Sequence, residues 1–144
     1  MTLESRIEKQ LKEGMKSGNS LRVSVLRMLR SAIHNAQIEK QEELEEEDVL
    51  EVLSREAKRR RESIEAYEQA GREDLRDKEK AELEIIKEFL PEPLTDEELR
   101  NLIQNVISDL GEATNLGAVM GKVMSQVKGQ AEGSHVRELV EEEL

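Results

Sequence analysis

The chain has 144 residues, a net charge of -11 and a charged fraction of 38%, with no Cys, no Trp, one Tyr and one Phe. The lack of Cys excludes a disulfide framework, a thiolate metal site and a cysteine nucleophile, and two aromatic rings are too few for a base-stacking platform. No apolar run approaches the roughly 20 residues of a membrane-spanning helix, and the charged N-terminus is unlike a signal peptide. We therefore expect a soluble, cytoplasmic, helix-rich protein with no membrane partner.

Four amphipathic helices are predicted in residues 1–90, at about 3–17, 21–40, 48–70 and 72–89, because apolar side chains recur there with helical spacing. Thr2 and either Asn19 or Ser20 are typical N-caps, and Gly18 and Gly71 are typical residues after a helix end. The apolar stripes predict buried faces that include Leu3, Ile7, Leu11 and Met15 in the first helix, and Leu21, Val25, Met28, Leu29, Ala32, Ile33 and Ala36 in the second.

The only two prolines, Pro91 and Pro93, stand in the segment 91–94. Proline cannot continue a helix and pushes the preceding residue into an extended conformation, so this segment is the predicted hinge between a domain at 1–90 and one at 95–144. In the second domain, Thr95 and Glu98 form a capping box for a helix that Gly111 ends, and two further helices are predicted at about 114–128 and from 133. The predicted fold class is all-α, with four helices joined by a proline hinge to a small three-helix domain.

Charge is distributed unevenly along the chain. Residues 1–40 carry eight basic and four acidic side chains, residues 41–54 carry seven acids and no base, and residues 55–61 carry five bases and one acid. The four consecutive bases Lys58, Arg59, Arg60 and Arg61 are candidate phosphate contacts. The alternative is ion pairing within their own helix, at about 0.3–0.5 kcal/mol per pair.

No catalytic constellation or cofactor motif is present in the sequence. The two histidines, His34 and His135, lie in different domains without metal-ligand spacing, and we expect His34 on a helix surface. Gly117 to Lys122 differs from a phosphate-binding loop because three residues rather than four separate the glycines and Val123 replaces the required Ser or Thr. We predict instead that Gly117 and Gly121 let two helix backbones approach closely, and we expect no catalytic residue, metal or cofactor.

One C-terminal pattern resembles the signature of the GatB/YqeY family, namely Gly117-x3-Gly121-x2-Met124-x3-Lys128-Gly129-x-Ala131-x-Gly133-x2-Val136. Residues 26–33, 60–72 and 84–91 are similar to the stand-alone YqeY-like proteins of that family. One departure is at Gly133, near which the family often carries an acidic residue in a Gly-x-Ala-Asp pattern; here Glu132 follows Ala131 and keeps the charge. The resemblance implies an all-helical fold whose C-terminal part is similar to the tail of the B subunit of tRNA-dependent amidotransferase, a part associated with tRNA binding.

The amidotransferase is a carbon–nitrogen ligase that uses glutamine as amido donor. Its kinase and amidase centres have no counterpart in this sequence, so an enzymatic label would be inherited from the larger enzyme. The resemblance favours an accessory protein that binds tRNA or another RNA, beside a protein of translation or amidation. The alternative is an acidic helical adaptor that binds proteins without touching nucleic acid and has an exposed apolar patch, which we expect near the hinge.

The candidate RNA contacts in the C-terminal domain surround the turn between its last two helices. Gly129 is predicted to end one helix, and Gly133 and Ser134 to open the next, whose free N–H groups can bind phosphate. Four nearby side chains complete this predicted site: Lys122, Lys128, His135 and Arg137. The alternative is a purely structural corner between two helices.

Overall fold

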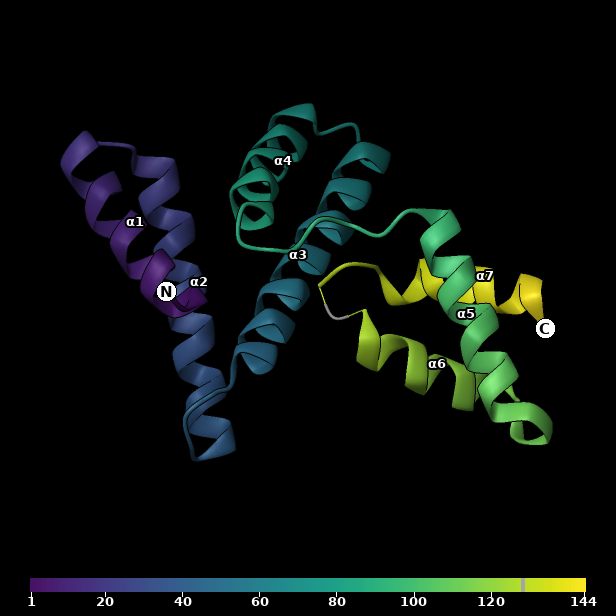
Figure 1. The fold of residues 1–144 in the computed structure, drawn as a ribbon. Helices are drawn as coiled ribbons and strands as arrows, with labels where there is room; N and C mark the ends of the chain where they lie inside the picture. Colours follow the sequence, from purple (N-terminus) through teal and green to yellow (C-terminus); the bar gives the residue numbers. More distant parts are fainter. Residues whose placement is uncertain (128) are drawn as a thin grey trace. The chain divides into compact units, whose positions relative to one another are not determined.

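The computed structural model describes residues 1–127 and 129–144, which form seven α-helices and one short 3₁₀-helix, with no strand among them. The all-α prediction is confirmed. The chain divides into two compact units, Met1–Leu90 and Pro91–Leu144 (Figure 1).

The first unit consists of two helical hairpins. Helices α1 (Leu3–Ser17) and α2 (Ser20–Lys40) lie side by side, and so do α3 (Glu46–Gln69) and α4 (Glu73–Lys87) (Figure 1). The predicted caps are confirmed, because the side-chain oxygen of Thr2 accepts from the Ser5 N–H at 3.1 Å and that of Asn19 accepts from the Arg22 N–H at 3.1 Å. Gly18 and Gly71 adopt positive φ angles of 75° and 70°, which favour glycine at a helix end.

The core of the first unit draws side chains from all four helices. Leu26 and Leu53 are fully buried, and Phe89 is 2% exposed. The Arg6 guanidinium lies over the Phe89 ring, 5.3 Å from its centroid, a geometry typical of a cation–π contact. The carboxylate of Glu88 pairs with Arg22 of α2 at 2.8 Å. These contacts fasten the residues that follow α4 to the first hairpin.

Two apolar residues of the predicted stripes are exposed. Met15 is 55% exposed and Leu21 is 36% exposed, so both predictions were wrong. A step of four residues turns a helix by about 400°, so the series that starts at Leu3 drifts around α1 by about 40° per step. Gly14 therefore takes the buried position in the last turn, where an added Cβ would lie only 3.2 Å from Cγ2 of Val23.

The second unit packs three helices around a valine-rich core. They are α5 (Asp96–Leu110), α6 (Leu116–Gln126) and α7 (Gly133–Glu143), with the 3₁₀-helix η1 (Gly111–Ala113) after α5. The predicted capping box is present: Thr95 Oγ1 accepts from the Glu98 N–H at 3.2 Å, and Glu98 Oε1 accepts from the Thr95 N–H at 3.4 Å. The buried side chains are Leu99, Ile103, Val106, Val119, Val123, Val127, Val136, Leu139 and Val140.

The proline segment is hydrogen-bonded within this second unit. The Leu94 N–H donates to the Gln130 carbonyl at 2.9 Å, and the Gln130 side-chain amide donates to the Glu92 carbonyl at 3.4 Å. The residues after Pro91 are thereby attached to the turn that precedes α7, and the boundary between the units falls at Leu90–Pro91.

Candidate nucleic-acid-binding residues

His135 lies in the first turn of α7 and contacts the first residue of α5. Its Nε2 is 2.7 Å from Oδ1 of Asp96, and Glu138 lies 3.9 Å from its Nδ1. The hydrogen bond to Asp96 raises the pKa of His135, and the same bond lowers the pKa of Asp96. The pair connects the beginnings of two helices, so the His135 ring is engaged by a carboxylate of its own unit.

The turn before α7 has the backbone geometry that the sequence predicts. Gly129 has a φ of 76°, a left-handed conformation that favours glycine. Gly133 is the first residue of α7 and Ser134, which follows it, is exposed. Arg137 donates to Glu141 one turn later at 3.1 Å, so its guanidinium is already engaged. Lys128 lies outside the described residues.

The outer face of α6 is bare in the sense that it carries glycines in place of larger side chains. Gly117 and Gly121 are both exposed, and a Cβ added at Gly121 would meet no atom within 4 Å. The prediction that these glycines let two helix backbones approach closely was therefore wrong at Gly121 within the described residues. Lys122 is exposed beside this face, and no ion pair involves it within the described part of the chain.

A buried carboxylate organises the basic segment of α3. The side chain of Glu56 is 10% exposed, and its two oxygens pair with Arg60 Nη1 at 2.9 Å and with Arg59 Nη1 at 3.3 Å. The Arg60 side chain is only 14% exposed, and its Nε lies 3.9 Å from Glu79 of α4. Arg60 is thus held between Glu56 of its own helix and Glu79 of α4.

The four predicted bases of α3 consequently have different surroundings. Lys58 is exposed without an ion pair among the described residues, and Arg59 is 70% exposed although it is paired. Arg60 is largely buried and Arg61 is half-buried with a partner of its own. The ion-pairing alternative thus holds for Arg59 and Arg60. Glu56, three residues before Arg59 and four before Arg60, was the sequence signal for it, but nothing local indicated that Glu56 is buried.

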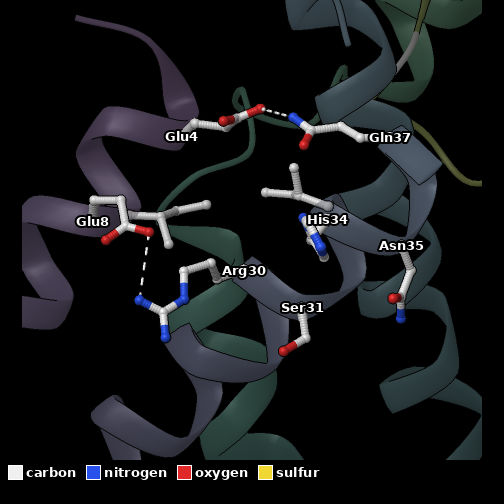
Figure 2. Close-up of a pocket in the computed structure, with 9 residues that line it drawn as sticks. Glu4, Glu8, Arg30, Ser31, His34, Asn35 and Gln37 are labelled. Carbon is white, nitrogen blue, oxygen red and sulfur yellow. Dashed lines mark hydrogen bonds and ion pairs between the residues drawn. The ribbon is translucent and has the colours of Figure 1, made fainter. Parts of the chain in front are cut away.

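A cavity of about 420 Å³ lies between α1 and α2 (Figure 2). Two polar contacts join the helices there: the Gln37 amide donates to Glu4 at 3.0 Å, and Arg30 lies 3.5 Å from Glu8. His34 also lines this cavity and is exposed, which confirms its predicted place on a helix surface. Sequence reasoning missed the cavity because its walls come from two helices whose register is not visible in either one alone.

The family model for the Yqey-like protein matches residues 4–144, which is almost the entire chain. The chain belongs to the YqeY-like family. The resemblance to stand-alone YqeY-like proteins is thereby confirmed.

Three fungal relatives are similar to this YqeY-like chain. An uncharacterized protein of Schizosaccharomyces pombe, C22F3.15, is 34% identical over 90 residues, which cover 62% of this chain and 73% of that protein. Altered inheritance of mitochondria protein 41, mitochondrial, from Lachancea thermotolerans is 31% identical over 112 residues, 76% of this chain and 60% of the relative. Its counterpart from Vanderwaltozyma polyspora is 29% identical over 109 residues, 74% of this chain and 59% of the relative. The chain thus spans about three fifths of the length of the latter two.

Among the described residues, no helix of this YqeY-like chain is long and apolar enough to cross a bilayer.

Proposed function

We propose that this YqeY-like protein is an accessory protein that binds tRNA or a similarly folded RNA through its phosphate groups. In this proposal it acts beside a protein of translation or amidation, and it does not catalyse carbon–nitrogen ligation by itself. The observation that carries the proposal is the bare outer face of α6, with Lys122 at its edge.

The glycine at position 121 costs stability without a packing benefit inside the unit. A mid-helix glycine is about 1 kcal/mol less favourable than alanine, and the space in front of Gly121 is open. The face continues at Ser125, whose hydroxyl is exposed and donates to the Lys122 carbonyl at 2.7 Å. A surface without side chains allows a phosphate backbone to come close to the helix, where Lys122 supplies the positive charge.

The turn at Gly129 and the start of α7 support the same function. The N–H groups in the first turn of a helix attract anions, and Gly133 and Ser134 add little bulk around those of α7. The two aromatic rings, Tyr67 and Phe89, are both in the first unit. Recognition by the second unit would therefore rely on phosphate groups and RNA shape rather than on stacking.

Binding of fluorescein-labelled tRNA, followed by anisotropy in 50–200 mM KCl, tests the proposal. We expect affinity to fall steeply with salt, and Lys122→Ala to lower the slope of log Kd against log salt by about 1. Gly121→Ala is the sharper variant, because it should raise helix stability by about 0.5–1 kcal/mol and still weaken binding. Absence of tRNA affinity from the wild-type chain at low salt rejects the proposal. Unchanged affinity in Gly121→Ala rejects the part played by α6.

The adaptor alternative requires an exposed apolar patch, which we expected near the hinge. The large apolar side chains exposed among the described residues are Met1, Met15, Leu21, Ile38 and Leu144. None of them belongs to residues 91–94 or to the flanking helices α4 and α5, so no large exposed apolar side chain marks that segment among the described residues. Recovery of a protein partner after complete nuclease digestion would favour the adaptor. A cytoplasmic location stays a prediction, since two of the relatives are named as mitochondrial proteins.

A further inference from the structure

A basic stripe runs along the outer face of α1. Lys9, Lys12 and Lys16 are spaced three and four residues apart, so their side chains fall within about 60° of one another around the helix. All three are exposed, on the side of α1 opposite the buried Ile7 and Leu11. Within the described residues, none of the three ammonium groups has an ion pair or a hydrogen bond.

Unpaired neighbouring lysines are unexpected in a chain with 33 acidic and 22 basic side chains. Several other surface cations have carboxylate partners, as Lys40 has in Asp48 at 2.7 Å and Arg72 has in Asp74 at 3.3 Å. Like charges four residues apart, such as Lys12 and Lys16, destabilise a helix by a few tenths of a kcal/mol. Folding stability therefore gives no reason for the stripe, whereas an anionic partner does.

The neighbouring helix extends the positive face. Contacts from Glu4 to Gln37 and from Glu8 to Arg30 set the antiparallel register of α1 and α2 (Figure 2). One helical turn further toward the connection, this register places Arg27 of α2 level with Lys12. Arg27 is exposed and has no ion pair among the described residues.

We infer that the face formed by Lys9, Lys12, Lys16 and Arg27 docks on the phosphate backbone of a folded RNA. The inference rests on the proposed function and adds a contact surface in the first unit. Phosphate contacts from Lys and Arg set position and most of the electrostatic affinity, without reading sequence.

Nucleic acid fits this face better than a lipid surface does. A helix that lies on a membrane needs a broad apolar face with aromatic or large aliphatic side chains. The apolar face of α1 is buried in the core, and the exposed Met15 and Leu21 near the connection do not continue as a stripe along either helix.

The test compares two triple variants with equal loss of charge in the same unit. The first is Lys9→Gln/Lys12→Gln/Lys16→Gln on α1, and the matched control is Lys78→Gln/Lys80→Gln/Lys87→Gln on α4, where all three lysines are also exposed. With labelled tRNA, we expect the α1 variant to lower the salt slope by about 2–3 and to weaken binding about tenfold or more at 100 mM KCl. The control should change the slope by less than about 0.5.

The other possible results separate a failure of the proposed function from a failure of the α1 contact surface. A wild-type chain that does not bind tRNA rejects the proposed function and this inference together. Wild-type binding that Lys122→Ala weakens but the α1 variant does not alter rejects the inference alone. Equal losses in both triple variants mean that only net charge matters and also reject it. A last experiment measures sedimentation with phosphatidylserine vesicles. If the α1 variant loses vesicle binding and keeps tRNA binding, the partner of this face is a membrane and the inference is rejected. Circular dichroism at 222 nm checks that both variants are folded.

Discussion

Removal of Arg60 should destabilise the first unit far more than removal of its neighbour Arg59. In Arg60→Ala, the Glu56 carboxylate, which is 10% exposed in the wild type, keeps only Arg59, whose side chain is 70% exposed. Breaking a fully buried ion pair by deleting one partner costs about 3–5 kcal/mol. Because solvent still reaches Arg60, which is 14% exposed, and one partner remains, we expect a loss of about 2 kcal/mol.

The assay is thermal and urea unfolding followed by circular dichroism. For a unit the size of Met1–Leu90, about 2 kcal/mol corresponds to a decrease in Tm of roughly 8–16 °C. Arg59→Ala is the matched control, since an exposed pair contributes about 0–1 kcal/mol. Glu56→Met/Arg60→Met replaces both charges by apolar side chains and should cost less than Arg60→Ala. The reasoning is refuted if Arg60→Ala stays within about 0.5 kcal/mol of the wild type, or if Arg59→Ala costs as much.

Three further changes test the second unit and the core. Since folding raises the pKa of His135 from 6.5 and lowers that of Asp96 from 3.8, their pair should stabilise the second unit most between about pH 4 and 6.5. The difference in Tm between wild type and His135→Gln should therefore shrink above and below this range, and a constant difference from pH 3 to 9 contradicts it. Thr95→Ala removes the capping contact with Glu98 and should cost about 1 kcal/mol in urea unfolding; a neutral effect means that the cap is dispensable. Phe89→Ala should cost about 3–5 kcal/mol, and a loss below about 1 kcal/mol means that the site collapses to fill the space.

The local signals in this sequence predicted most of the fold. Caps such as Thr2 and Thr95 act within three residues, so their hydrogen bonds can be inferred without knowing what the helix packs against. The left-handed glycines at 18 and 71 are similarly local. Met15 shows where this approach fails, because a small error in helical period accumulates over three turns and only packing against α2 decides which side chain is buried.

The candidate site was harder to predict than the fold. The sequence placed four bases together in α3, but Glu56 is buried there, and its pairing with Arg60 at 2.9 Å gives Arg60 a structural role. In the sequence, the exposed glycine face at Gly121 could not be distinguished from a helix-packing motif, because a glycine pair four residues apart is typical of each. The lysine stripe of α1 was visible in the sequence as part of a net-positive segment, yet the absence of ion pairs there depends on where distant carboxylates lie.

The distribution of rings between the two units has a spectroscopic consequence. Tyr67, the only tyrosine, belongs to the first unit, which also contains His34, whereas the second unit contains His135 and no phenyl, phenol or indole group. Tyrosine fluorescence therefore reports on the first unit alone, and the imidazole C–H protons of His34 and His135 provide a natural NMR reporter for each unit. Melting of either unit, and the effect of RNA on it, can be followed in the unlabelled wild-type chain.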